Sequence, residues 1–158
     1  MIMKTESPQG KYKDDKTYEN VVNYVIQPGK CPSGHIITRN VNRNSIADDM
    51  ANLEKKLKKR KGSTKIRHTV FSFEDQDEAT PELAAVIADK ICEFYADRYQ
   101  IVAAVHEDTD HLHIHMVTST TDIHSGKKHT GRKKDYYGFT RHVRKEARKH
   151  GMKFKTVK

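Results

Sequence analysis

The chain has 158 residues, a length suited to one domain that buries roughly 70% of its unfolded surface. Its residues are 35% hydrophobic and 32% charged, but the apolar residues recur in periodic runs, which excludes a disordered chain. No apolar stretch is long enough to span a membrane and no hydrophobic signal segment opens the sequence, so we expect a cytoplasmic protein. Cys31 and Cys92 fit neither a disulfide framework nor a CxxC motif and are expected to be reduced structural thiols.

Residues 1–15 are polar and carry no period, so we expect a flexible N-terminal arm. An amphipathic helix is predicted over residues 16–27, because its apolar positions recur at helical spacing until Pro28 and Gly29. Tyr18 lies within the apolar stripe of this helix and should be buried. Tyr24 falls about 120° from the centre of that stripe and should lie on the flank of the helix.

The remaining elements are predicted from periodicity and from residues that begin or end helices. In chain order they are a weak strand or loop (30–44), a helix (45–61), a strand (65–73), a helix (from 80), two strands (101–106 and 111–117) and a final helix (135–151). The strands and helices lack the regular spacing of parallel βαβ units. We therefore expect an α+β fold, an antiparallel sheet with flanking helices, spanning residues 16–152 and followed by a basic tail over 153–158.

Positive charge is concentrated in the last third of the chain. The formal net charge is +9, and residues 126–158 hold 13 Lys or Arg against 2 acidic residues, which gives +11 there and −2 for the rest. Tyr136, Tyr137 and Phe139 are interleaved with these cations. This composition favours a groove for a polyanion, since neutralisation of phosphates supplies most non-specific nucleic-acid affinity.

Four histidines fall within residues 106–115, HEDTDHLHIH. His111, His113 and His115 alternate with apolar residues, so on a strand their imidazoles would share one face. Alternate residues on a strand are about 6.7 Å apart, so His111 and His115 would be about 13 Å apart, too far to share one metal. Two neighbouring histidines plus His106 from the preceding strand form the feasible ligand set.

Two such ligand sets remain open on pattern alone. A hairpin closed by a four-residue turn would place His106 opposite His111, which favours His106, His111 and His113. The other set is His106, His113 and His115. Either set leaves coordination positions open, as in a catalytic metal centre. Asp108 and Asp110 could accept hydrogen bonds from the ligands or could simply form the turn.

The segment HEDTDHLHIHMV, following an AAV strand, resembles the histidine motif of relaxases, specifically the MobP-like mobilisation nucleases of the HUH endonuclease superfamily. The segments RHTVFSF, NYVIQPGK and SGKK are similar to the preceding strand, the tyrosine segment and the glycine-basic turn of that family. The resemblance covers roughly residues 16–152 and implies a palm-like fold. It also implies His106, His113 and His115 as the metal ligands. Ser119 stands where the family more often has asparagine.

The resemblance implies site- and strand-specific nicking and religation of DNA through a 5′-phosphotyrosyl intermediate. Tyr24 is the expected nucleophile, because it matches the family position and lies off the apolar stripe, with Tyr18 as the second candidate. Asp108 is a candidate to help activate the tyrosine. The implied cofactor is Mg²⁺ or Mn²⁺, and the implied partners are single-stranded DNA at an origin of transfer, accessory relaxosome proteins and a coupling protein. Relaxases commonly continue into helicase, primase or oligomerisation regions. This sequence shows the pattern of none of them, so we expect an isolated nuclease domain.

Six basic residues are expected to bind DNA, and all but Arg141 directly follow the histidine strand and should emerge near the metal: Lys127, Lys128, Arg132, Lys133, Lys134 and Arg141. Three other functions compete with a relaxase. A rolling-circle replication initiator or a single-strand transposase shares the histidine motif. A metallohydrolase needs neither the tyrosine nor the basic segment, and a plain nucleic-acid-binding module would bind without cleavage.

Overall fold

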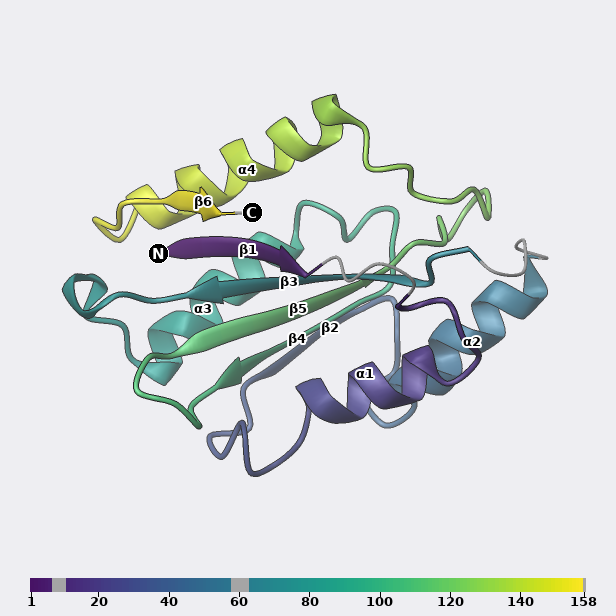
Figure 1. Cartoon of the computed structure of the whole chain (residues 1–158), viewed down its shortest axis with the longest axis horizontal. Helices are drawn as coiled ribbons and strands as arrows, with labels where there is room; N and C mark the ends of the chain where they lie inside the picture. Colours follow the sequence, from purple (N-terminus) through teal and green to yellow (C-terminus); the bar gives the residue numbers. More distant parts are fainter. Residues whose placement is uncertain (7–10, 58–62, 158) are drawn as a thin grey trace.

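The computed structural model describes residues 1–6, 11–57 and 63–157 (Figure 1). Within these residues the chain forms a six-stranded sheet in the order β2-β4-β5-β3-β1-β6. The strands are β1 (Ile2–Glu6), β2 (Ile36–Arg39), β3 (Ile66–Ser72), β4 (Ile101–His106), β5 (His113–Ser119) and β6 (Lys155–Val157). β1 and β6 run parallel, and the other neighbouring strands that the structure describes run antiparallel. The α+β class and the antiparallel sheet are therefore confirmed.

Helices cover both faces of this sheet: α1 (Thr17–Val25), α2 (Ile46–Lys56), α3 (Pro81–Cys92) and α4 (Lys133–Arg148). The alternation along β4 separates two cores, because successive side chains of a strand point to opposite faces. Val102 packs with α1 and α2, whereas Ala103 packs with α3 and α4. Figure 1 shows α1 and α2 along the lower side of the sheet and α4 along the upper side.

The helix boundaries follow local signals that the sequence carries. Thr80 accepts a hydrogen bond at Oγ1 from the backbone amide of Leu83 (3.1 Å), and Pro81 occupies the first turn of α3. Gly151, with a φ of +72°, lies just beyond α4 in the left-handed conformation that suits glycine. The last turn predicted for the helix over 45–61 falls partly on residues 58–61, outside the described residues.

The flexible N-terminal arm predicted over residues 1–15 is wrong for residues 2–6, which form β1, and the basic C-terminal tail includes a strand, β6, over residues 155–157. β1 pairs with β3, and β6 pairs with β1, so both chain ends extend the sheet. Met1 is fully buried, and its ammonium lies 2.7 Å from the Oδ2 of Asp77. Strands of five and three residues are too short to show a hydrophobic period. They form because their backbones pair with strands that are distant in the sequence. Residues 7–10 of the predicted arm lie outside the described residues.

The two cysteines are buried free thiols, as predicted. Burial raises the pKa of the Cys92 thiol to about 12, so this side chain is chemically inert at neutral pH. In the part of the chain that the structure describes, every helix is too short or too polar for a transmembrane segment.

Candidate active site

The β4–β5 ladder brings three histidines to the α1 and α2 side of the sheet. His106 pairs with His113, so the alternative in which a four-residue turn sets His106 opposite His111 is wrong. The turn spans residues 107–112 because Leu112 leaves the ladder and accepts a bond at its carbonyl from the amide of Phe73 (3.0 Å). His111 is exposed instead, and its Nδ1 lies 3.4 Å from a carboxylate oxygen of Asp75.

His106, His113 and His115 lie close together on this face. The ring centroids of His106 and His115 are 4.1 Å apart, and those of His113 and His115 are 6.0 Å apart. The Nε2 of His106 donates to the carbonyl of Val25 (2.7 Å), because a carbonyl can only accept. The proton of His106 is thereby fixed on Nε2, and its Nδ1 keeps a lone pair.

All three imidazoles are held neutral. Burial lowers the pKa of His106 and of His113. Burial, followed by the neighbouring His106, lowers the pKa of His115 to about 3. Neutral imidazoles carry the lone pairs that metal ligands need, so no proton has to be displaced at neutral pH.

The present orientation of the rings is not that of a closed metal site. The rings of His106 and His115 are stacked with an interplanar angle of 27°, so their in-plane lone pairs do not converge on one point. Among the described residues, no three His, Cys, Asp or Glu side chains are placed to hold a metal ion as they stand. The donor chemistry fits a divalent cation, and its binding would require at least one ring to turn.

The two candidate tyrosines on α1 occupy different environments. Tyr18 is 3% exposed and donates to the Glu54 carboxylate (2.6 Å), and burial together with this bond raises its pKa. Tyr24 is 44% exposed and lies edge-on to His106 and His115, with ring centroids 5.7 and 5.6 Å away. Their places in and off the apolar stripe are as predicted, and only Tyr24 of the pair faces the histidines.

Lys30 and Asp108 form an ion pair beside Tyr24. The Lys30 Nζ lies 3.0 Å from the Asp108 Oδ2 and 5.0 Å from the centre of the Tyr24 ring. The Lys30 hydrogen bond lowers the pKa of Asp108, which makes this carboxylate a weak base at neutral pH. Lys30 closes the NYVIQPGK segment, but no local pattern marks it as a site residue, because its partner is 78 residues away.

His68 and Tyr12 are two further members of the site that were not predicted from the sequence. The Nε2 of His68 lies 2.9 Å from the Nδ1 of His115, and the Tyr12 hydroxyl lies 3.4 Å from the Nδ1 of His68. His68 is buried and shares the sheet face of Val70, which pairs with His115. The alternation of the RHTVFSF strand could have placed it there. Its bond with His115 limits the orientations that the His115 ring can adopt.

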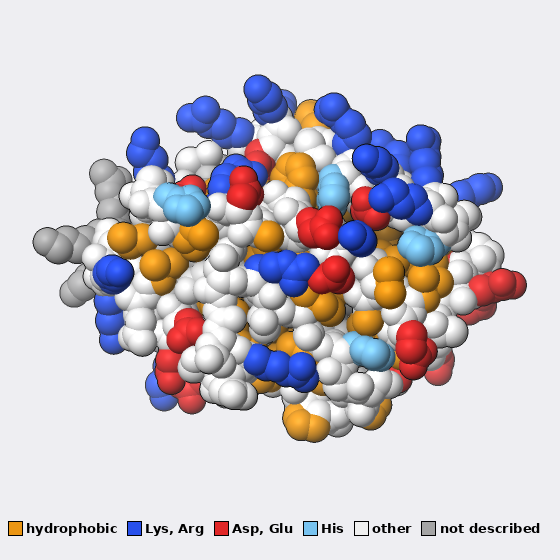
Figure 2. Space-filling model, turned by 180° about the vertical axis from the view of Figure 1, so that it is seen from behind, with side chains coloured by type: hydrophobic (Ala, Val, Ile, Leu, Met, Phe, Trp, Pro, Cys, Tyr) orange, Lys and Arg blue, Asp and Glu red, His pale blue; other side chains and the backbone are white. Residues whose placement is uncertain are grey.

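The predicted DNA-binding residues lie away from the histidines. β5 carries the chain about 20 Å from His113 to Ser119 before the basic segment begins, so the expectation that this segment emerges near the metal is wrong. Figure 1 shows the 107–112 turn and the loop before α4 at opposite ends of the molecule. Figure 2 shows Lys and Arg side chains along the upper margin, over α4. All six predicted DNA-binding residues are exposed: Lys127, Lys128, Arg132, Lys133, Lys134 and Arg141.

Comparison with known proteins identifies the family of this chain. Residues 24–152 match the relaxase family described as the MobA/VirD2-like nuclease domain. The chain therefore belongs to the MobA/VirD2-like relaxase nuclease-domain family. The match spans most of the chain and includes Tyr24, all four clustered histidines and the six basic residues.

Individual relatives agree with this assignment. The chain is 34% identical over 67 residues to protein rlx of Staphylococcus aureus, covering 42% of this chain and 20% of rlx. It is 36% identical over 62 residues to the group II intron-interrupted relaxase LtrB of Lactococcus lactis subsp. cremoris, covering 39% of this chain and 11% of LtrB. The chain thus aligns with a fifth or less of either relative's length.

A solved structure shares the fold. It comes from work on the molecular basis of vancomycin resistance transfer in Staphylococcus aureus, and it superposes with a TM-score of 0.54 at 13% identity. The superposition covers 77% of this chain and 72% of the other. At this identity the likeness concerns the arrangement of helices and strands, which agrees with the expected relaxase fold.

Proposed function

We propose that this chain nicks and rejoins one DNA strand at an origin of transfer, with Tyr24 as the nucleophile. His106, His113 and His115 would hold a divalent cation, Mg²⁺ or Mn²⁺. The observation that carries the proposal is the position of Tyr24, whose exposed ring lies within 5.7 Å of two neutral imidazoles from different strands. Membership of a relaxase nuclease family supports the reaction class.

The proposed reaction is a transesterification. The phenolic oxygen of Tyr24 attacks the scissile phosphorus in line, a bond from that oxygen to phosphorus forms, and the bond from phosphorus to the 3′ oxygen breaks. The phenol loses its proton and the departing 3′ oxygen gains one, which leaves a 5′-phosphotyrosine and a free 3′-hydroxyl. A bound divalent cation would supply positive charge to a phosphate oxygen. The ester keeps the energy of the bond, so attack by the 3′-hydroxyl reverses the step without ATP.

Lys30 would assist Tyr24 electrostatically. A free phenol has a pKa near 10, so it needs a nearby positive charge or a base to react at neutral pH. The Lys30 Nζ lies 5.0 Å from the Tyr24 ring centre, so this ammonium would stabilise the negative charge that develops around the attacking oxygen in the transition state. Asp108 is ionised and bonded to Lys30, so it is better suited to holding this lysine than to accepting the phenol proton.

A covalent-adduct experiment tests the proposal. The protein is incubated with Mg²⁺ or Mn²⁺ and a single-stranded oligonucleotide spanning its transfer origin, then resolved on a denaturing gel. We expect an adduct that survives heat, carries the DNA through its 5′-phosphate and is abolished by chelation. Tyr24→Phe should form none while still binding DNA, because it removes one hydroxyl from an exposed ring. Tyr12→Phe and Tyr18→Phe are the matched controls and should retain the adduct.

Each other outcome points to a different function. An adduct formed through Tyr12 or Tyr18 would reject Tyr24 as the nucleophile. Free 5′-phosphate ends without an adduct would indicate a water nucleophile and a metallohydrolase, and binding without cleavage would indicate a passive binding module. A random oligonucleotide should bind without forming an adduct, since electrostatic binding is indifferent to sequence while productive docking is not.

A further inference from the structure

A cavity of about 150 Å³ lies on the opposite side of the sheet, between the strands and α4. The hydroxyl-bearing Thr69 of β3 and Thr118 of β5 line its floor, and Arg67 contributes a guanidinium. Tyr95, Tyr136 and Phe139 supply aromatic walls. The cavity thus combines flat apolar walls with a few fixed polar groups, the usual composition of a site for a small ligand.

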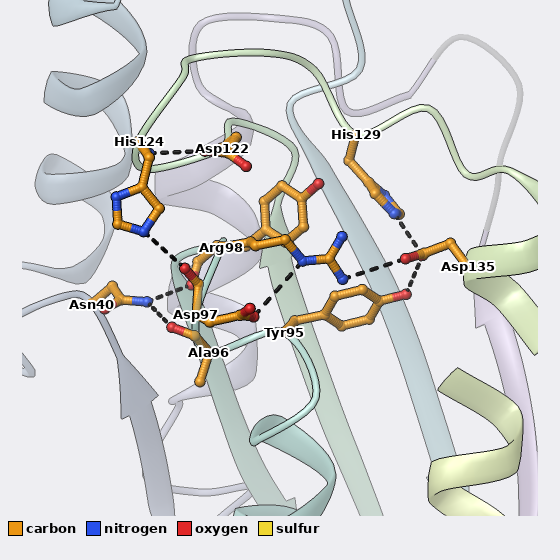
Figure 3. Close-up of polar contacts among 10 residues, drawn as sticks. Asn40, Tyr95, Ala96, Asp97, Arg98, Asp122, His124, His129 and Asp135 are labelled. Carbon is orange, nitrogen blue, oxygen red and sulfur yellow. Dashed lines mark hydrogen bonds and ion pairs between the residues drawn. The ribbon is translucent and has the colours of Figure 1, made fainter. Parts of the chain in front are cut away.

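A polar cluster behind this cavity fixes its shape. Asp135 accepts hydrogen bonds from the Tyr95 hydroxyl (2.7 Å) and from the Nε2 of His129 (2.8 Å). Figure 3 shows His129, Tyr95 and Arg98 converging on this carboxylate. Arg67 donates to the Nδ1 of His129 (2.9 Å), so both ring nitrogens of His129 are engaged. With its ring nitrogens occupied, His129 serves as a support and not as a proton carrier.

The loop before α4 closes tightly on Arg67. Gly131 has a φ of +64°, and a Cβ atom at this position would lie 2.3 Å from the Nη2 of Arg67. Glycine suits this positive φ, and any other side chain here would have to displace the end of the Arg67 side chain. The Arg67 guanidinium is therefore held between the loop and His129. It lines the cavity, and it has N–H donors beyond the one that bonds to His129.

The size and surroundings of the cavity define its ligand. A cavity of about 150 Å³ accepts a single aromatic ring such as benzene, whereas drug-sized sites measure roughly 300–1,000 Å³. Exposed cations on the adjoining loop and helix start, Lys127, Lys128, Arg132 and Lys133, provide contacts for phosphates. Aromatic walls stack on a base of any sequence, while the hydroxyls and Arg67 can distinguish its edge.

We infer that this cavity binds one unpaired base of the DNA strand, at a point remote from the scissile phosphate. The inference rests on the proposed function, because it takes the substrate to be a single DNA strand. A paired base cannot present its face to the aromatic walls without leaving its stack. The base would stack on the exposed ring of Tyr136, with its edge toward Thr69 and Thr118.

An abasic scan tests this site. Each nucleotide of the origin oligonucleotide is replaced in turn by an abasic residue, and the dissociation constant is measured without added metal. At one position, loss of the base should weaken binding to the unmodified protein by roughly tenfold. Tyr136→Ala should weaken binding to the complete oligonucleotide by a similar factor and should no longer respond to the abasic residue at that position.

Tyr137→Ala is the matched control, since Tyr137 is the next residue, is 59% exposed and lies outside the cavity lining. It should keep the abasic response. Tyr136→Phe preserves the ring and should also keep it, which separates stacking from any effect on folding. Thr118→Val should keep the response to base loss but reduce the preference among bases, because it removes a hydroxyl and preserves shape.

Two results would overturn the inference. The first is an abasic scan with no sensitive position, and the second is a sensitive position to which Tyr136→Ala and Tyr137→Ala respond alike. Both are binding measurements and do not depend on cleavage. If the abasic response couples to Tyr136 but no covalent adduct forms on Tyr24, the nicking proposal fails while the base site stands.

Discussion

His115 and His129 are both largely buried imidazoles, but they lie on opposite sides of the sheet in contrasting settings. His115 contacts His68 through Nδ1, and no hydrogen bond to its Nε2 is found in the described part of the chain. His129 is held between Arg67 and Asp135. Burial lowers the pKa of both residues, although the bond to Asp135 opposes the shift for His129. A neutral imidazole with a free nitrogen can bind a cation, whereas one engaged at both nitrogens acts as structure.

The largest expected effect of this difference is on metal binding. His106→Ala, His113→Ala and His115→Ala should each weaken Mn²⁺ binding by at least roughly 100-fold, because each removes a proposed ligand. His129→Ala is the matched control and should leave the affinity unchanged. Calorimetric titration at neutral pH measures all four.

The same titration can contradict the ligand assignment. His111 lies outside the cluster, so His111→Ala should retain the metal. Loss of Mn²⁺ in His111→Ala with retention in His115→Ala would mean that His111 is the third ligand. Loss in His129→Ala would remove the distinction between the two faces.

Most of the fold was predictable because its signals are local. Amphipathic periods and capping residues predicted the four helices, and β-branched runs predicted β3, β4 and β5. β1 and β6 were not predictable in this way, since each of these short strands is defined by pairing with residues more than 60 positions away. Their pairing is a property of the assembled sheet, in which Met1 and Met3 are buried.

The candidate site was predictable in composition but not in register. Alternation of His113 and His115 with apolar residues placed them on one face, whereas the pairing of His106 depended on how Leu112 leaves the ladder. The cluster of Arg67, His129 and Asp135 gave no signal at all. Arg67 and His129 are 62 residues apart, and each is an ordinary polar residue in its own segment.

The second largest effect is expected from replacing one aspartate on each side of the sheet with asparagine. These are Asp135, behind the cavity, and Asp108, beside Tyr24. Asp135 is ionised because the bonds from Tyr95 and His129, opposed by burial, hold its pKa below the usual value. Asp135→Asn should lower the free energy of unfolding by about 1–3 kcal/mol, since it weakens charge-assisted bonds to buried partners. Urea denaturation at neutral pH measures this, and adduct formation per folded molecule at saturating oligonucleotide should stay within about twofold.

Asp108→Asn should do the reverse. This carboxylate is on the surface of the turn and pairs with Lys30, so stability should change by less than about 0.5 kcal/mol. Adduct formation should slow by roughly tenfold, because Lys30 loses the partner that holds it over Tyr24. Equal losses of stability in both variants would show that Asp108 is also structural and that the contrast between the faces is mistaken.

Acid dependence sharpens the same contrast. A carboxylate whose folded pKa is depressed stabilises the protein fully above its unfolded pKa of about 3.9, and this stabilisation is lost as the pH falls through the folded pKa. The unmodified protein should therefore lose stability below about pH 4 more steeply than Asp135→Asn, which has no carboxyl to protonate there. If the free energy of unfolding fell with the same slope below pH 4 in both proteins, Asp135 would not be held ionised by its cluster.

The smallest effect per residue concerns the salt dependence of DNA binding. Replacing Lys127, Lys128, Arg132 or Lys133 singly with alanine should weaken binding to every single-stranded oligonucleotide by a few fold. It should also flatten the slope of log K against log salt by about 0.7 for each phosphate that the variant no longer neutralises. Lys55→Ala and Lys56→Ala are matched controls, because these exposed lysines lie on α2, on the histidine side of the sheet. Fluorescence anisotropy at several salt concentrations gives each slope.

An unchanged slope in the first group would show that the basic segment is only a solvated surface. Flattening confined to Lys55 and Lys56 would place the strand along α2, and would leave the cavity beneath α4 without the phosphate contacts that a bound base requires.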